Sequence, residues 1–311
     1  MLLEWTGFED VAMFSTGSEA TEAAWRACMV YSGKPGVWGG MPDPDNIGQE
    51  QAGYDAMHGN TLGAMIMAGR LSWGSHIFAS LVAGAFAAEH GSTGMMIMEP
   101  YHGPSAQFYP DSLMTKLRAN VKEFTEIPLC FDEVQAGFGR TGRKFGYQWY
   151  DGMTPTLITT GKAMGGGYPL SALFGPKDFI QQPDAVLHST HSGHPVMCSV
   201  GIAVLEQIQK HDLVEQSFRK GMLLADLLKD CGVRHHAGKG LIAGLEFKDD
   251  KQAAKVVKLC RERGLLVVDT GRKWVKLGPP LIIDDDLLGE GVEIIKRAIG
   301  QVIVEGAEVR E

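Results

Sequence analysis

Short apolar runs that end in turn residues alternate with helix-length amphipathic segments over the first two thirds of the chain. The runs include VAMF, GMMIMEP, PLCFDE, TLITTG and LSALFGP, and helices are expected at residues 18–31 and in HIFASLVAGAFAAEHG. This alternation predicts an α/β fold, a mostly parallel sheet with helices on both faces. Because ligands of such sheets bind beyond the carboxyl ends of the strands, polar residues that follow the apolar runs are the site candidates.

The pattern changes after about residue 213 to helix, strand, helix, a pair of strands (LLVVD and WVKLG) and a final helix. We therefore expect a large cofactor-binding α/β domain over residues 1–213 and a smaller C-terminal α+β domain over residues 214–311. Residues 32–53 are rich in Gly, Pro and Asp, which predicts a long loop.

Charge and cysteine content narrow the class of partner. The net charge of -8 and the lack of a basic run argue against nucleic acid and anionic membranes, so a small-molecule ligand is expected. The 5 cysteines are scattered and show no CxxC spacing, as is typical of a reducing cytoplasm. The first residues resemble no signal peptide, and the apolar segment at residues 77–88 is short for a membrane span.

Two segments carry the first candidate residues. Asp132 and Glu133 end the apolar run PLCF, and a buried carboxylate needs a compensating charge. In STGSEAT, Gly17 and Ser18 stand at a strand-to-helix junction, where backbone amides of a helix N-terminus can bind a phosphate. The alternative for STGSEAT is that Ser18 or Thr16 only caps the helix. Glu99, at the end of GMMIMEP, either contacts a ligand or bonds to nearby loop amides.

Two further motifs follow. Lys162, in TTGKAMGGGYPLSA, comes directly after a strand, where a confined lysine can act as an imine-forming nucleophile; the alternative is a surface lysine. A P-loop is excluded because the glycines follow the lysine. The three histidines of HSTHSGHP do not favour a metal site, because Gly193 and Pro195 break the helix that would align them.

A phosphate cradle, an imine-forming lysine and a buried carboxylate are together what pyridoxal phosphate requires. Asp132 would hold the pyridine nitrogen of the cofactor protonated, so that the ring becomes an electron sink. The order and wording of STGSEATEAAW, MEP, FDEVQAGFGRTG, TTGKAMGGGYPLSA and HSTHSGHPV resemble the class III (omega) aminotransferases, pyridoxal phosphate enzymes of fold type I. The resemblance runs from Val11 to the final helix.

The resemblance implies roles for individual residues. Lys162 forms the Schiff base with pyridoxal 5'-phosphate and shuttles a proton, and Asp132 pairs with the pyridinium. Val134 packs on one face of the ring, and Gln135 lies beside the ring hydroxyl.

Gly17 and Ser18 hold the phosphate by the same resemblance. Thr190 matches a threonine that reaches the phosphate of the neighbouring subunit, which implies a homodimer with shared active sites. Met57 replaces the usual aromatic residue that stacks on the ring, and His58 follows it as in the family; a thioether can pack on a ring face.

Two departures concern the substrate. Pro104 and Lys276 stand where several members have a glutamate and the arginine that it gates, so ordinary binding of glutamate or 2-oxoglutarate through that arginine is not expected. A lysine still attracts a carboxylate as a point charge. Members of the family also carry roughly 80–100 residues ahead of the phosphate motif, a segment that this chain is expected to lack.

The leading hypothesis is a cytoplasmic transaminase that moves an amino group from an amine or amino acid to a keto acid or aldehyde. One alternative is an isomerase of the glutamate-1-semialdehyde aminomutase type, in which donor and acceptor are the same molecule. A second alternative is a catalytically impaired protein that only binds pyridoxal phosphate.

Overall fold

The computed structural model describes residues 1–33, 36–39, 93–103, 105–111, 114–115 and 127–308. The chain forms two compact units. The first comprises Met1–His102, Tyr109–Phe138 and Phe145–Ile208, and the second comprises Gly103–Phe108, Gly139–Lys144 and Gln209–Glu311. The predicted domain boundary between residues 213 and 214 stays a prediction.

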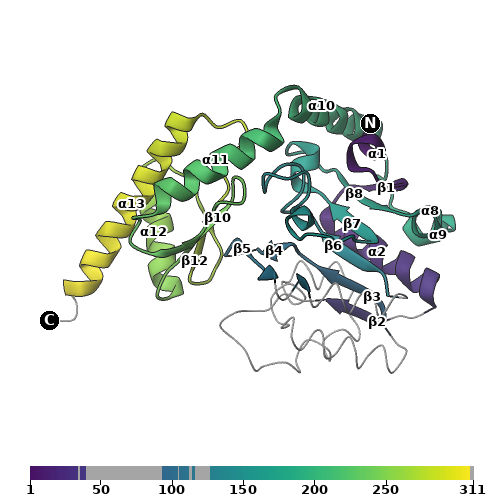
Figure 1. The fold of residues 1–311 in the computed structure, drawn as a ribbon, viewed down its shortest axis with the longest axis horizontal. Helices are drawn as coiled ribbons and strands as arrows, with labels where there is room; N and C mark the ends of the chain where they lie inside the picture. The colour runs from purple at the N-terminus through teal and green to yellow at the C-terminus, as the bar shows by residue number, and fades with distance from the viewer. Residues whose placement is uncertain (34–35, 40–92, 104, 112–113, 116–126, 309–311) are drawn as a thin grey trace. The chain divides into compact units, whose positions relative to one another are not determined.

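A mixed sheet forms the centre of the first unit (Figure 1). Its described strands lie in the order β1 (Asp10–Phe14), β8 (Ser171–Gly175), β7 (Leu157–Thr160), β6 (Leu129–Asp132), β3 (Thr93–Met98) and β2 (Gly36–Gly39). Strands β2, β3, β6 and β7 run parallel, and β8 is antiparallel to both of its neighbours. The mostly parallel α/β sheet predicted from the sequence is confirmed.

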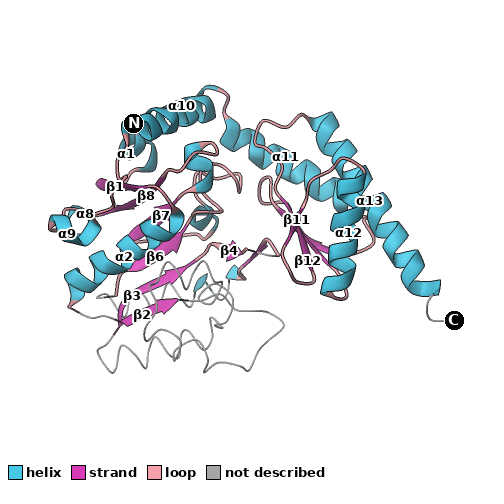
Figure 2. Ribbon diagram, turned by 180° about the vertical axis from the view of Figure 1, so that it is seen from behind, coloured by secondary structure: helices cyan, strands magenta, loops and turns pink. Residues whose placement is uncertain are grey.

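Helix α2 (Gly17–Ser32) packs on this sheet with one face (Figure 2). The helix residues that are buried at helical spacing are small, which lets the helix axis approach the strands closely: Ala20, Ala23, Ala24, Ala27 and Cys28. They share a core with strand residues Phe14, Ile97, Cys130, Leu157 and Leu173. The amino end of α2 is thereby fixed beside the ends of the central strands.

Other helices and two short turns belong wholly or mainly to the first unit. The helices are α1 (Leu2–Thr6), α8 (Lys177–Ile180), α9 (Asp184–Leu187) and α10 (Pro195–Lys210), and the turns of 3-10 helix are η1 (Gly146–Trp149) and η2 (Lys162–Gly165). The chain also contains the two-residue strands β4 (Tyr101–His102) and β5 (Gln107–Phe108). Among the described residues, no helix has the length and apolar character needed to cross a membrane.

Part of the predicted long loop at residues 32–53 is a strand. Gly36–Gly39 forms β2, which pairs in parallel with β3. Two of its four residues are glycines, which are rare inside strands, so the composition did not predict a strand here. The expectation of an uninterrupted loop was therefore wrong for these residues. Residues 34–35 and 40–53, like the predicted helix in HIFASLVAGAFAAEHG, lie outside the described residues.

The second unit contains an antiparallel sheet and three long helices. Its described strands are ordered β11 (Val268–Asp269), β12 (Trp274–Leu277), β10 (Ala243–Glu246) and β9 (Arg234–His236), and its helices are α11 (Leu213–Leu228), α12 (Asp250–Glu262) and α13 (Asp285–Glu308). Side chains from the three helices and from β10 and β12 form one buried apolar core. The predicted pair of strands and the final helix are confirmed by β11, β12 and α13.

Helix α11 approaches the turn at Gly240 very closely. A Cβ atom at Gly221, in the middle of α11, would lie 2.4 Å from the Gly240 carbonyl oxygen. Gly289, in α13, has no described atom within 4 Å of the same position. The two glycines therefore sit in opposite environments within helices of one unit.

We predict opposite effects of one substitution at these two positions. Gly221→Ala should lower the free energy of unfolding by about 1–3 kcal/mol, because the backbone of the Gly240 turn has to move. Gly289→Ala should raise it by up to about 1 kcal/mol, because alanine favours the helix and meets no neighbour. Urea unfolding of both variants measures the difference, and equal effects would contradict the close approach.

Candidate active site

Three segments of the first unit meet at the carboxyl ends of β6 and β7. A Cβ atom at Gly17, the first residue of α2, would lie 2.9 Å from Val134 Cγ2, which follows β6. The Cβ position of Gly161, which follows β7, is 3.4 Å from Val134 Cγ1 and 3.6 Å from Gly17 Cα. The structure thus places Gly17, Val134 and the residue before Lys162 around one point.

Asp132 is the last residue of β6 and is only 5% exposed. Its Oδ1 accepts a hydrogen bond from the Val134 N–H at 3.0 Å. Burial raises the pKa of Asp132, while the hydrogen bond from Val134, the positive charge of Lys162 and the Thr159 side chain oppose that rise. A buried carboxylate of this kind is stabilised by a cationic partner, as the sequence indicated.

Lys162 begins the turn η2 directly after β7 and Gly161. Its φ of 37° is in the left-handed region, which is unfavourable for a residue with a side chain. Such strained residues cluster at functional sites, where the surrounding structure fixes them. The Lys162 side chain is exposed.

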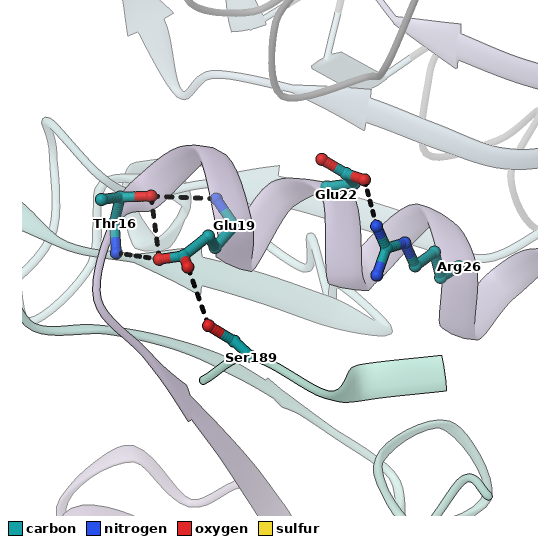
Figure 3. A network of polar contacts seen from close by, with 5 residues as sticks. All are labelled: Thr16, Glu19, Glu22, Arg26 and Ser189. Atoms are coloured by element: carbon teal, nitrogen blue, oxygen red, sulfur yellow. Dashed lines mark hydrogen bonds and ion pairs between the residues drawn. The ribbon is translucent and has the colours of Figure 1, made fainter. Parts of the chain in front are cut away.

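The amino end of α2 combines capping with unused donors (Figure 3). Thr16 Oγ1 accepts from the Glu19 N–H at 3.2 Å, and Glu19 Oε2 accepts from the Thr16 N–H at 2.7 Å, which forms a capping box. Among the described residues, no acceptor bonds to the N–H groups of Gly17 or Ser18. Capping by Thr16 is therefore observed, and two amides of the first turn stay available for an anion.

Gln135 and Glu99 are joined across neighbouring strand ends. Gln135 Nε2 donates to Glu99 Oε1 at 3.0 Å, and Glu99 directly follows β3. An ionised carboxylate only accepts, so the amide must turn its NH₂ group toward Glu99. Glu99, whose role the sequence left open, thus fixes the orientation of the Gln135 side chain.

Glu133, the second carboxylate of the pair, is compensated differently from Asp132. Its side chain is buried and accepts from two successive backbone amides, Gly146 N at 2.7 Å and Tyr147 N at 2.8 Å. Burial raises the pKa of Glu133 from 4.5 to about 8; these two hydrogen bonds oppose the rise, and the charge of Asp132 adds to it. Glu133 thereby anchors the start of η1 through both of its carboxylate oxygens.

The segment after α9 is attached to the same corner. Ser189 Oγ donates to Glu19 Oε1 at 2.8 Å, and Ser192 Oγ donates to the Met13 carbonyl oxygen. Thr190 is exposed between them. The sequence missed Ser189 altogether, while the TxxE spacing of Thr16 and Glu19 is a signal that predicts the capping box.

The other residues singled out from the sequence lie outside the described residues or in the second unit. Met57, His58 and Pro104 lie outside the described residues. Lys276 is part of β12 in the second unit, and half-buried. The described site therefore consists of Asp132, Val134, Gln135, Lys162 and the first turn of α2.

Comparison with known proteins agrees with the residue pattern. The sequence model of the family described as "Aminotransferase class-III" matches residues 75–299, more than two thirds of the chain. An ornithine aminotransferase of Emericella nidulans is 26% identical over 336 residues, which cover 97% of this chain and 72% of that protein. An acetylornithine aminotransferase of Gloeobacter violaceus is 29% identical over 326 residues, which cover 97% of this chain and 78% of that protein.

Solved structures show the same fold. The ornithine delta-aminotransferase of Plasmodium falciparum superposes with a TM-score of 0.76 at 25% identity, over 97% of this chain and 76% of that chain. An S-selective transaminase from Arthrobacter sp. gives a TM-score of 0.78 at 22% identity, which supports the fold alone. The fold class predicted from the sequence is confirmed by these neighbours.

The buried Glu133 predicts a specific pH dependence of stability. Because its pKa is raised in the folded protein, the folded state binds the proton more tightly than the unfolded chain, and stability falls as pH rises from about 4.5 to about 8. The variant Glu133→Gln cannot titrate there. Its deficit in unfolding free energy should shrink with rising pH, by at most about 1.4 kcal/mol per pH unit.

Urea unfolding at a series of pH values measures this difference. Glu206→Gln is the matched control, because Glu206 is exposed on α10 and its variant should follow the native profile. Parallel profiles of the native protein and Glu133→Gln would contradict the proposed burial of a titrating Glu133.

Proposed function

Because this chain belongs to the class III aminotransferase family and is therefore a transaminase, we propose that it uses pyridoxal phosphate attached to Lys162 as a Schiff base. Dependence on this cofactor is a property of the family. The observation that carries the proposal is the meeting of Gly17, Val134, Asp132 and the Gly161-Lys162 turn at the ends of two parallel strands. This is the edge where α/β sheets bind ligands.

The residues fit the chemical groups of the cofactor. The free N–H groups of Gly17 and Ser18 suit a phosphate, and the contact of Gly17 with Val134 leaves no room for a Cβ atom there. The buried Asp132 suits a protonated ring nitrogen, which would supply the missing positive charge. Val134 offers an apolar surface for one face of a flat ring.

The bound cofactor supplies an electron sink for the carbanion that forms when the substrate loses a proton. In this proposal Asp132 keeps the ring nitrogen protonated. Lys162 would move the proton at the reacting carbon of the substrate as acid and base. Gln135, held by Glu99, orients the ring through its hydroxyl group.

For the substrate we propose an amine or amino acid donor and a keto acid or aldehyde acceptor. The relatives are named for ornithine and acetylornithine, which favours an amino acid donor with a second nitrogen-bearing end. Their names as aminotransferases do not favour the isomerase or the impaired binding protein. Lys276, in place of the family's arginine, would attract a substrate carboxylate without a bidentate contact.

We further propose a cytoplasmic homodimer in which the exposed Thr190 of one subunit reaches the phosphate site of the other.

The absorbance spectrum of the protein with pyridoxal phosphate, before and after addition of single amines and amino acids, tests the proposed transamination. A donor that converts the bound cofactor to its pyridoxamine form, with release of a keto product, is the expected result. Bound cofactor that no donor discharges would contradict transamination by this chain.

Removal of the attachment lysine gives a sharper test. Lys162→Ala should abolish the covalent link to the cofactor that borohydride reduction makes permanent, while unfolding remains near native because the side chain is exposed. Mass spectrometry of the reduced protein measures the link. Lys177→Ala, which removes an exposed lysine after the neighbouring strand β8, should retain it. A retained link in Lys162→Ala would mean that another lysine is used.

The role of Asp132 is tested by a neutral isostere. Asp132→Asn should still take up the cofactor but slow proton abstraction by roughly 10²–10³-fold, the size typical of one lost electrostatic stabiliser. Single-turnover kinetics with the best donor, followed by absorbance, measure the step. An unchanged rate would remove Asp132 from the mechanism.

A further inference from the structure

One carboxylate connects the first turn of α2 with a segment distant in the sequence (Figure 3). Glu19 Oε2 accepts hydrogen bonds from Ser15 N at 3.1 Å, Thr16 N at 2.7 Å and Thr16 Oγ1 at 3.1 Å. Glu19 Oε1 accepts from Ser189 Oγ at 2.8 Å. Both oxygens are therefore used, one within the turn and one outside it.

The second oxygen is not required by the helix itself. A capping box needs only the reciprocal bonds between Thr16 and Glu19, and these are complete without Ser189. The next ion pair along α2, Glu22 with Arg26, takes no part in the network (Figure 3). The hydrogen bond from Ser189 therefore attaches the Ser189 segment to α2 and is not needed to cap the helix.

That segment is largely exposed and has few other attachments. Residues 190–196 are exposed, and Ser189 is only half-buried. Ser192, bonded to the Met13 carbonyl oxygen, provides one further tie to the core of the unit. Since Thr190 lies between these two serines, the two hydrogen bonds determine where its backbone runs.

Electrostatics keep Glu19 in its accepting form. Burial raises the pKa of Glu19, but hydrogen bonds from Ser189, Thr16 and Ser15 outweigh that effect and hold the pKa below its ordinary value. An ionised carboxylate can only accept, so it holds the N–H groups of Ser15 and Thr16 and leaves those of Gly17 and Ser18 to an anion.

We infer that Glu19 and Ser189 are positioning residues, which together set the Thr190 segment at a fixed place relative to the phosphate-binding turn. The inference rests on the proposed function, because it assumes that the turn binds the cofactor's phosphate and that Thr190 serves the phosphate of the neighbouring subunit. Among the described residues, the side chains of Glu19 and Ser189 bond only to Ser15, Thr16 and each other. Their effect is therefore confined to the phosphate end of the ligand.

An effect limited to the phosphate end of the ligand can be tested with pyridoxal, which lacks the phosphate but can still react with a lysine. The dissociation constants of pyridoxal phosphate and of pyridoxal are measured by absorbance titration of the full-length protein. Ser189→Ala should weaken binding of pyridoxal phosphate about tenfold, the loss expected for one hydrogen bond to a charged group, and leave pyridoxal within about twofold.

Two further variants serve as controls. Ser189→Thr keeps a hydroxyl group at the position and should restore most of the affinity for pyridoxal phosphate. Ser199→Ala removes a hydroxyl whose one hydrogen bond to a described residue is to the Pro195 carbonyl oxygen within α10, and should bind both compounds as the native protein does. Thermal unfolding, followed by circular dichroism, should give near-native midpoints for all three variants.

The outcomes separate the inference from the proposed function. If Ser189→Ala binds pyridoxal phosphate as tightly as the native protein, or loses affinity equally for both compounds, the positioning role is wrong, although borohydride still attaches the cofactor to Lys162. If the native protein attaches no cofactor at Lys162, the proposed function fails and the inference falls with it. A loss specific to pyridoxal phosphate, rescued by Ser189→Thr, supports the inference.

Discussion

The burial of Asp132 at the end of β6 is the constraint on which the site depends. A carboxylate removed from water is unfavourable unless a cation or several donors face it. Here one backbone amide, the charge of Lys162 and the Thr159 side chain offset only part of the effect of burial on the pKa of Asp132. Its neighbour Glu133 meets the same problem with two amides of η1. Of the two adjacent acids, Glu133 accepts backbone hydrogen bonds with both oxygens and Asp132 accepts one with Oδ1, so Asp132 is the better candidate for a cationic ligand.

The backbone amides at the start of α2 likewise fall into two groups, those used by the helix cap and those left free by the described residues. Glu19 occupies the amides of Ser15 and Thr16, which completes the cap, while the amides of Gly17 and Ser18 stay free of described acceptors. Gly17 brings this turn against Val134 because a side chain would collide there. The small buried residues of α2 hold the helix on the sheet, so packing in the core sets the distance between the proposed phosphate site and the proposed ring site.

Local signals in the sequence predicted much of this arrangement. The apolar runs that became β6, β7 and β8 are compact and end in turn residues, and the motifs around Asp132 and Lys162 follow them directly. Strand β2 was missed because two glycines conceal it, and the exposure of Lys162 depends on what surrounds it in space. The bond between Ser189 and Glu19 joins residues far apart in the sequence, and no local pattern reports such a contact. Met57 and His58, predicted beside the cofactor, remain predictions.

The pairing of Asp132 with a cationic ring is the central claim, and nitrogen-15 NMR tests it directly. The protein is loaded with pyridoxal phosphate that carries the label at the ring nitrogen, and its chemical shift is compared with that of the free cofactor in acid and in base. The account predicts the shift of a protonated ring nitrogen in the native protein near neutral pH, and that of an unprotonated nitrogen in Asp132→Asn. An unprotonated ring nitrogen in the native protein would contradict the claim.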